Sequence, residues 1–410
     1  MNFGPIRGGL LENDGWIDFS RVMLFVGNQG SGKSTVAKLF STFSWIEKAL
    51  VRGDYDQRWF GRKNRLRTQF LKYHRLENFL ELDGTDKATI EYEGDAYAIH
   101  YAQGQMTISE RTSGSYHLPQ VLYVPAERNF LAYVRNPQGL KLVSDALKEF
   151  VTEFENAKLS IRNAVNLPIN GAELEYDKLN DLLNVRAPGY KLRLTDASSG
   201  FQSFVPLYLV SKHLADTVQQ HAEAVNDTMS ADELERFKAG VASIFSNESL
   251  TEEQKRAAIS VLSSRFNKTA FVNIVEEPEQ NLFPSSQWAV LQCLLEFNNQ
   301  TKHNRLVMTS HSPYIVNFLS IAVQGQELSR KIESVRPGDK TLLNRLDGVV
   351  SRGALVDGSQ VSIYQLDEDA GTIRRLESSD GFPSERNYLN DSLREGNRRF
   401  DELLEIEGEL

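Results

Sequence analysis

The run with the most specific chemistry is GNQGSGKS, residues 27–34. It matches G-x-x-x-x-G-K-[ST] and stands between an apolar run and a segment with helical spacing, as a phosphate-binding loop requires. Its three glycines let backbone N–H groups turn toward phosphate oxygens, and the following helix adds the positive end of its dipole. Lys33 would reach the β- and γ-phosphates, Ser34 would ligate Mg²⁺, and Thr35 would contact the α-phosphate. The predicted nucleotide-binding residues of this loop are Gly27, Asn28, Gln29, Gly30, Ser31, Gly32, Lys33, Ser34 and Thr35.

A second candidate is the carboxylate pair Glu276 and Glu277, which follows the apolar run FVNIV at 271–275. A buried strand that ends in acidic residues brings their charge to the carboxyl edge of a parallel sheet. We expect Glu276 to bind Mg²⁺ through water and Glu277 to polarise an attacking water as general base. The alternative is a solvated acidic turn. This is the weaker interpretation because the same sequence contains the phosphate-binding motif.

His311 directly follows another apolar run, RLVMTS at 305–310. A histidine in this place can hydrogen-bond the γ-phosphate and the attacking water, although a lone histidine after a strand is often structural. The predicted catalytic residues are therefore Glu277, His311 and Lys33.

Ser198, Ser199 and Gly200 stand at an apparent helix start in LTDASSGFQSFVPL. Hydroxyls and free N–H groups at such a start can bind an anion, so these residues are predicted to contact nucleotide as well. The competing interpretation is an ordinary helix cap.

These residues need a layered α/β scaffold to position them. Apolar periodicity predicts helices over 33–50, 285–297 and 313–323 and mainly helical blocks over 137–184 and 205–266, with helix starts at Ser230 and Thr251. Strands are predicted within 15–26, 88–110, 120–124, 190–194, 271–275, 305–310 and a hairpin over 361–376. The alternation indicates a sheet covered by helices on both faces, with 88–110 as an antiparallel β side lobe and the helical blocks as insertions.

Read in chain order, GNQGSGKS, ASSGFQS, IVEEPEQNLFP and TSHSP resemble the Walker A, signature, Walker B and switch-histidine motifs of ABC ATPases. The form is similar to the RecF/SMC/OLD branch, and specifically to prokaryotic ATP-binding proteins encoded with anti-phage defence effectors. The resemblance covers roughly 1–45, 86–130, 190–212 and 268–325. It implies a P-loop ABC-type ATPase head that uses ATP and Mg²⁺. It also implies a head-to-tail homodimer or higher homo-oligomer, in which Ser199 and Gly200 of one subunit close on ATP held by another.

The chain departs from that family at several positions. The signature reads ASSGFQ rather than LSGGQ, Phe283 replaces a frequent histidine, and Gln69 is a weak candidate for the Q-loop glutamine. Arg128, in the run YVPAERN, has no role assigned from the sequence. Without a long coiled coil or a CxxC hook the chain does not resemble Rad50. The acidic cluster Asp367, Glu368 and Asp369 is interpreted as a hairpin turn rather than a nuclease site, so no TOPRIM domain is expected.

The predicted organisation has six parts. They are 1–130, the N-terminal half of the ATPase core with the β lobe; 131–189, a helical insertion; 190–212, the signature segment; 213–267, a second helical insertion; 268–325, the C-terminal half of the core; and 326–410, a C-terminal extension.

Residues 52–75 carry eight Arg/Lys and two Asp, interleaved with Trp59, Phe60, Phe70 and Tyr73. Cations with aromatics suit phosphate contact and base stacking, so nucleic acid is a possible partner. The alternative is an amphipathic element whose aromatics pack inward while its charges are solvated or dock an acidic protein.

Composition narrows the class. A net charge of −9 argues against a surface built for nonspecific nucleic-acid binding. The single cysteine, Cys293, excludes a disulfide framework and is expected to be a small core residue. The sequence contains no signal peptide and no apolar run near the ~18 residues that span a bilayer, which predicts a cytoplasmic protein without membrane contact.

The leading hypothesis is an ATPase whose nucleotide-dependent dimerisation senses a trigger and controls a separately encoded effector in anti-phage defence. The alternatives are a RecF-like DNA-repair ATPase and an ATP-stabilised scaffold with little turnover; a transporter subunit ranks last.

Overall fold

The computed structural model describes residues 2–80, 88–111, 116–134, 142, 144–224, 231–247, 250–263, 268–376, 378–379, 382–383 and 387–408. Within these residues, no helix has the length and apolar character needed to cross a membrane. The start of the second helical block at Ser230 and the first residues of the block predicted from 137 lie outside the described residues.

A seven-stranded sheet runs through the centre of the molecule in the order β1-β14-β13-β2-β12-β11-β6. From β13 to β6 all neighbours are parallel, whereas β14 is antiparallel to β13. The strands are β1 (Gly9–Leu10), β2 (Val22–Gly27), β6 (Pro119–Val124), β11 (Ala270–Glu276), β12 (Arg305–Ser310), β13 (Val361–Asp367) and β14 (Thr372–Arg375). Parallel register matters for function because the carboxyl ends of β2, β12 and β11 meet at one edge.

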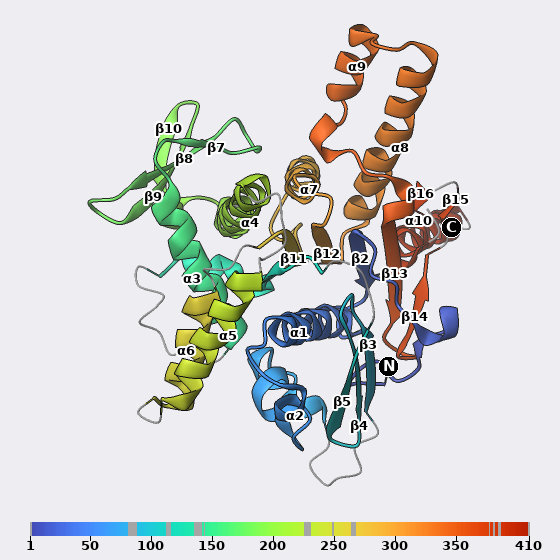
Figure 1. The fold of residues 1–410 in the computed structure, drawn as a ribbon. Helices are drawn as coiled ribbons and strands as arrows, with labels where there is room; N and C mark the ends of the chain where they lie inside the picture. Colours follow the sequence, from blue (N-terminus) through green and yellow to red (C-terminus); the bar gives the residue numbers. More distant parts are fainter. Residues whose placement is uncertain are drawn as a thin grey trace.

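Strand β2 is buried along its whole length because both of its faces are covered. Met23 and Phe25 pack with Val36 and Phe40 of α1 (Lys33–Val51), while the alternate residues of β2 face the other layer. That layer consists of α4 (Ser199–Ala224), α7 (Pro284–Asn299) and α8 (Pro313–Val335), whose apolar faces share one core with β2, β11 and β12. Figure 1 shows α1 below the sheet and α4, α7 and α8 above it. The predicted α/β architecture is confirmed.

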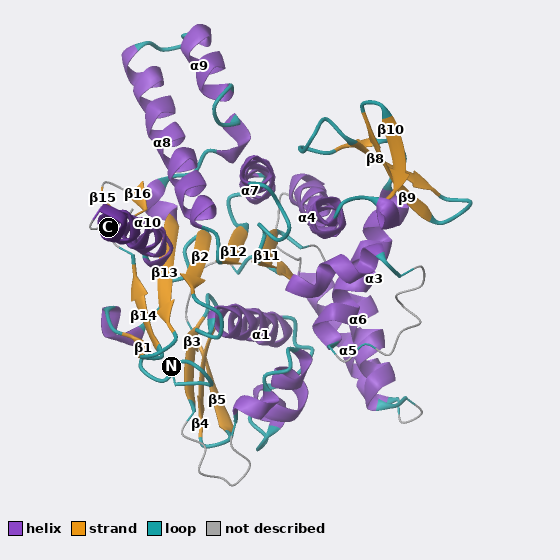
Figure 2. Cartoon of the chain, turned by 180° about the vertical axis from the view of Figure 1, so that it is seen from behind, coloured by secondary structure: helices purple, strands orange, loops and turns teal. Residues whose placement is uncertain are grey.

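The predicted side lobe is an antiparallel sheet of β3 (Thr89–Glu93), β4 (Tyr97–Ala102) and β5 (Gln105–Glu110). It lies below α1 in both views (Figures 1 and 2). In the chain, α1 and this lobe are separated by α2 (Gln57–Phe60) and a π-helical turn over Leu66–Leu71. The antiparallel prediction for 88–110 is confirmed.

The mainly helical prediction for 137–184 is only partly right. Helix α3 (Asp145–Ser160) lies there, but β7 (Val165–Asn166), β8 (Glu173–Asp177) and β9 (Leu182–Ala187) follow it and join β10 (Tyr190–Arg193) in a four-stranded antiparallel sheet. In β8 and β9 the buried side chains alternate with less buried ones, as at Leu174, Val185 and Ala187. This period of two marks a half-buried strand, and the helical interpretation overlooked it.

The second helical block is confirmed by the part of α4 from residue 205 onward and by α5 (Ala231–Ser246) and α6 (Glu252–Ser263). Thr251 caps α6 as predicted. Its Oγ1 accepts from Gln254 N at 3.2 Å, and Gln254 Oε1 accepts from Thr251 N at 3.0 Å, which is a reciprocal capping box.

The interpretation of 326–410 as an extension outside the core is wrong in one respect. The predicted hairpin forms, but its first strand, β13, lies directly beside β2, with Ile363 paired to Leu24. Residues 361–366 of β13 are all buried, so both faces of this strand are covered within the central sheet. The rest of this segment contains α9 (Lys340–Asp347), β15 (Ser378–Ser379), β16 (Phe382–Pro383) and α10 (Tyr388–Gly408).

Candidate functional site

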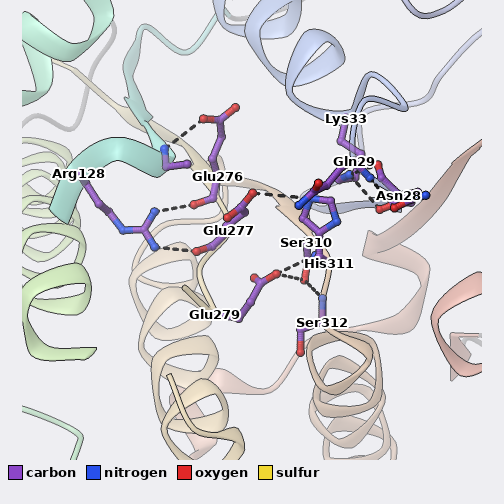
Figure 3. Close-up of polar contacts among 12 residues, drawn as sticks. Asn28, Gln29, Lys33, Arg128, Glu276, Glu277, Glu279, Ser310, His311 and Ser312 are labelled. Atoms are coloured by element: carbon purple, nitrogen blue, oxygen red, sulfur yellow. Dashed lines mark hydrogen bonds and ion pairs between the residues drawn. The ribbon is translucent and has the colours of Figure 1, made fainter. Parts of the chain in front are cut away.

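The predicted chemical residues converge at the carboxyl edge of the central sheet. Residues 28–32 connect β2 to α1, Glu277 follows β11, and His311 follows β12. Because β12 lies between β2 and β11, these three loops are neighbours (Figure 3). The convergence follows from parallel pairing of strands that lie far apart in the sequence.

The glycines of the loop adopt backbone conformations that other residues rarely reach. Gly27, Gly30 and Gly32 have φ of 151°, 78° and 99°. A Cβ on Gly27 would lie 2.5 Å from the Leu366 carbonyl oxygen of β13, and one on Gly32 would lie 2.9 Å from Ile6 Cγ1. The glycine spacing is therefore required by both backbone shape and close packing.

Lys33 folds back across the loop. Its Nζ donates to the carbonyls of Gly27 at 2.9 Å and Asn28 at 2.7 Å. Burial lowers the pKa of Lys33 to about 8, and the carboxylates of Glu277 and Glu279, the next largest influences, act in the opposite direction. The ammonium thus lies in a partly desolvated position where an anion would stabilise its charged form.

The hydrogen-bond donors of the loop suit a phosphate group. Within the described residues, the Ser31 hydroxyl is buried without a hydrogen-bond partner, although the loop surrounds it. The N–H groups at the start of α1 have no partners within the helix, because the first turn of any α-helix leaves them unpaired. Donors without acceptors, together with a desolvated ammonium, fit an oligophosphate.

Ser34 and Glu276, the two residues predicted to bind Mg²⁺, offer oxygen atoms as metal ligands. Glu276 is buried; its Oε2 accepts from Ala126 N at 3.1 Å and its Oε1 lies 3.9 Å from Lys38 Nζ. Ser34 lies in the first turn of α1. The described residues contain no group of three or more His, Cys, Asp or Glu placed to hold a metal. Mg²⁺ is usually held by one or two protein ligands plus phosphate and water, so this sparse set fits a metal that arrives with nucleotide.

Glu277 and His311 face each other across the edge, with Oε1 and Nε2 3.6 Å apart. Burial raises the pKa of Glu277, and the nearby Glu276 adds to this effect. Burial lowers the pKa of His311, as does Lys33. The pair therefore tends toward a neutral histidine beside a carboxylate of increased basicity, which suits the orientation of a water molecule.

The backbone of Glu277 is held in the left-handed region at φ 45°. A non-glycine residue there costs on the order of 1 kcal/mol. Two contacts fix it: Glu277 N donates to the Thr309 carbonyl of β12 at 2.9 Å, and its own carbonyl accepts from Arg128 Nη2 at 2.6 Å. This strained conformation directs the side chain of Glu277 toward His311.

Arg128, to which the sequence assigned no role, is fully buried in the turn that follows β6, beside the end of β11. Its Nη1 donates to the carbonyls of Pro125 at 3.2 Å and Glu276 at 2.7 Å, and its Nε donates to the Ser203 carbonyl of α4 at 3.0 Å. The guanidinium thereby joins the loop after β6 and α4 to the end of β11, and Figure 3 shows its contacts with Glu276 and Glu277. The run YVPAERN was the available signal, but nothing local in it indicates that the arginine is buried.

Glu279 was also missed. This partly buried carboxylate accepts from Ser310 Oγ at 2.8 Å and from His311 N at 2.7 Å through Oε1. It ties the backbone of the histidine to the loop that carries Glu277. Burial raises the pKa of Glu279. The third acid of EEPE was its sequence signal.

The signature residues lie on the other side of the sheet from α1. Helix α4 begins at Ser199, as predicted, and the side chains of Ser198 and Ser199 are exposed. A Cβ on Gly200 would lie 3.1 Å from the Asn281 carbonyl, so this turn packs on the loop that follows Glu277. The helix start is confirmed; its contact with nucleotide stays a prediction.

The aromatics of residues 52–75 pack against the protein, and nucleic acid as a partner of this segment stays a prediction. Phe60 is fully buried, Trp59 and Phe70 pack against the same cluster, and Tyr73 donates to Glu149 of α3. The alternative is confirmed: the aromatics face inward, while the exposed cations are Arg58, Arg62, Lys63, Lys72 and Arg75. Gln69, in the π-helical turn, makes none of the contacts described above, so its Q-loop role also stays a prediction.

The acidic cluster forms a turn, as expected. Asp367 Oδ1 accepts from the N–H groups of Asp369 and Ala370, both at 2.9 Å. Glu368 instead accepts from Asn28 Nδ2 at 2.6 Å, which links the β13–β14 turn to the glycine-rich loop before α1. Cys293 packs against the main core, as predicted.

Comparison with known proteins finds no matching family model and no matching curated protein. Among solved structures, the chain is similar to the SMC head domain from Thermotoga maritima, with 13% identity and a TM-score of 0.27, over 74% of this chain and 85% of that one. It is also similar to an SMC head bound to the C-winged helix domain of ScpA, with 11% identity and a TM-score of 0.33, over 88% and 92% of the two chains. Such low TM-scores do not define a family for this protein.

Proposed function

We propose that this protein binds and hydrolyses ATP as an ABC-type ATPase. The observation that carries the proposal is the meeting of Lys33, Glu277 and His311 at one sheet edge, with the carboxylate and the imidazole 3.6 Å apart. A group of residues with a purely structural role would gain nothing from a partly desolvated lysine, nor from a glycine-rich loop whose hydrogen-bond donors have no acceptors.

Binding begins with the loop. Lys33 exchanges the carbonyls of Gly27 and Asn28 for phosphate oxygens, and Ser31 gains an acceptor for its hydroxyl. Ser34 and Glu276 would hold Mg²⁺, which supplies a Lewis acid that neutralises charge on the phosphates.

Hydrolysis uses Glu277 and His311, which follow β11 and β12. Glu277 accepts a proton from the attacking water, and its raised pKa makes it a better base than an exposed glutamate. His311 orients the same water and the γ-phosphate in its neutral form. Arg128 and Glu279 are positioning residues, because they hold the backbones of Glu277 and His311.

The signature turn supports a composite site between two copies. Ser198 and Ser199 expose hydroxyls at the start of α4, a helix of 26 residues. We propose that this turn closes on ATP bound by a second copy and that the ATP-bound dimer controls a separate effector. The assignment to anti-phage defence rests on the motif resemblance. The inward packing of the aromatics in 52–75 leaves only the exposed cations of that segment to favour direct action on DNA.

The decisive experiment is Glu277→Gln. We expect turnover to fall about 10²–10⁴-fold, the usual contribution of a general base, while ATP still binds and the dimer accumulates. Phosphate release and light scattering with ATP measure the two effects. Glu333→Gln, on the exposed side of α8, is the matched control. Unchanged turnover in Glu277→Gln would refute the assignment, and a wild-type protein that binds ATP without hydrolysing it would favour the scaffold hypothesis.

A further inference from the structure

A cavity of about 290 Å³ lies at the amino edge of the central sheet, opposite the edge that carries the proposed ATP site. Arg21 directly precedes β2, Arg305 begins β12, and Gln360 directly precedes β13. Because these strands are parallel, their first residues meet at this edge and line the cavity together. The rest of the lining includes Ser44 of α1 and Tyr92 of the β lobe. The volume is close to the lower end of the range for small-molecule sites.

Three cations line this cavity: Arg21, Lys302 and Arg305. Within the part of the chain that the structure describes, neither Arg21 nor Lys302 forms an ion pair. Arg305 has a distant partner, since its Nη2 lies 4.0 Å from Asp95 Oδ1. The carboxylates of the protein therefore compensate little of the positive charge at the start of these strands.

The hydrogen bonds of Arg21 hold its guanidinium in place without neutralising it. Its Nη2 donates to the carbonyls of Asn298 at 2.8 Å and Thr301 at 3.1 Å, and its Nη1 donates to Gln360 Oε1 at 3.3 Å. Its Nε is buried and has no hydrogen-bond partner within the described residues. Burial lowers the pKa of Arg21, so an anion beside the guanidinium would stabilise its charged form.

His117 and His303 form a stacked pair in the same cavity, with ring centroids 3.4 Å apart and an angle of 16° between the rings. Burial lowers the pKa of His303, and the neighbouring His117 and Lys302 lower it further, whereas Asp95 acts in the opposite direction. Arg21 also lowers this pKa. Because Lys302 and Arg21 both act on one imidazole, the two cations lie near the same part of the cavity.

Glu47, a carboxylate in the lining, has donors of its own. Its Oε1 accepts from Ala96 N at 2.7 Å and from the next N–H along the chain at 3.1 Å, and its Oε2 accepts from the Tyr92 hydroxyl at 2.7 Å. These donors belong to the β lobe and the turn between β3 and β4. The charge of Glu47 is therefore stabilised by the lobe, and Glu47 forms no ion pair with the three cations.

We propose that this cavity binds a small organic phosphate. The phosphate group lies against Arg21, Lys302 and Arg305, since two guanidinium groups and an ammonium suit a dianion with several acceptor oxygens. The carbon part lies against Phe19 and Phe40, whose rings stack in the lining with centroids 3.9 Å apart. The site is separate from the proposed ATP site, because the two lie at opposite ends of the same parallel strands.

The first test titrates the intact chain with phenyl phosphate and measures the heat of binding by calorimetry. Lys33→Ala is titrated in parallel, because a phosphate can also bind the glycine-rich loop before α1. We expect phenyl phosphate to bind both proteins, and inorganic phosphate and phenol to bind more weakly. The proposal would be overturned if phenyl phosphate did not bind at millimolar concentration, if either fragment bound as tightly, or if Lys33→Ala abolished binding.

The second test locates the site with variants made in the Lys33→Ala chain. Lys302→Gln and Arg305→Gln should each weaken phenyl phosphate binding about tenfold or more, the usual contribution of a hydrogen bond to a charged group. Lys331→Gln, at an exposed lysine of α8, is the matched control and should bind with unchanged affinity. Lys302 is exposed, so its replacement should leave thermal unfolding without ligand unchanged. Unchanged affinity in both cavity variants, or an equal loss in Lys331→Gln, would contradict the proposal, and neither test depends on ATP hydrolysis.

Discussion

The sheet edge and segment 52–75 both contain many charged residues, but the two regions differ in which side chains the fold buries. At the sheet edge it buries Arg128 and Glu276, partly buries Glu279, and connects all three to backbone groups at the ends of several strands. In segment 52–75 it buries the aromatics and leaves most of the cations in solvent. Buried charge costs free energy unless it is fully paired, so its presence at one edge indicates a selected arrangement, whereas a solvated cation indicates little.

The strongest test of this contrast is Arg128→Ala. Loss of the guanidinium leaves several carbonyls unpaired and releases the strained backbone of Glu277, so we expect about 3–5 kcal/mol of destabilisation. Denaturant unfolding measures this change. Arg162→Ala, at an exposed arginine, should change stability by less than about 0.5 kcal/mol. Equal stability of the two variants would break the contrast.

Phe60→Ala tests the other region. Removal of a fully buried phenylalanine should cost about 3–4 kcal/mol, which lowers the melting temperature. ATP affinity of the folded variant should stay within about twofold of wild type, because the side chain does not contact the sheet edge. A large loss of affinity in the folded protein would show that the two regions are coupled.

Proton linkage at Lys33 should produce a smaller effect. Its pKa of about 8 in the ATP-free protein lies below the ordinary lysine value of 10.5, and bound phosphate would raise it again. Binding therefore takes up a proton when the pH exceeds about 8, and affinity should fall by up to about tenfold per pH unit above that point. Calorimetry in buffers of different ionisation enthalpy measures the uptake. Lys33→Arg should remove this dependence, and an equal dependence in that variant would assign the proton to another group.

Arg62→Glu should have the smallest effect. Its side chain is exposed, so stability should change by less than about 0.5 kcal/mol. We expect no salt-dependent binding of single-stranded DNA by either wild type or variant, measured by fluorescence anisotropy. Tight wild-type binding that Arg62→Glu weakens would restore the nucleic-acid hypothesis for the exposed cations.

Sequence reasoning succeeded where the requirement is local. The glycines of 27–34 reflect backbone conformations that the loop needs, and apolar runs such as 271–275 are recognisable as buried strands. It failed at β8 and β9, where a period of two was present but assigned to helix. It also failed at Arg128, because a buried and an exposed arginine look identical in a sequence.

The sequence by itself determined which residues could bind phosphate and activate water, and in which order they occur. Only the tertiary structure decided that β13 lies beside β2, that Glu279 holds His311, and that the aromatics of 52–75 face inward. The reason is physical: turns and strand ends depend on neighbouring residues, whereas burial and pairing depend on residues that are distant in the chain. For Arg128 and Ser203, which lie 75 positions apart, the shared hydrogen bond exists only because the fold brings β6 and α4 together.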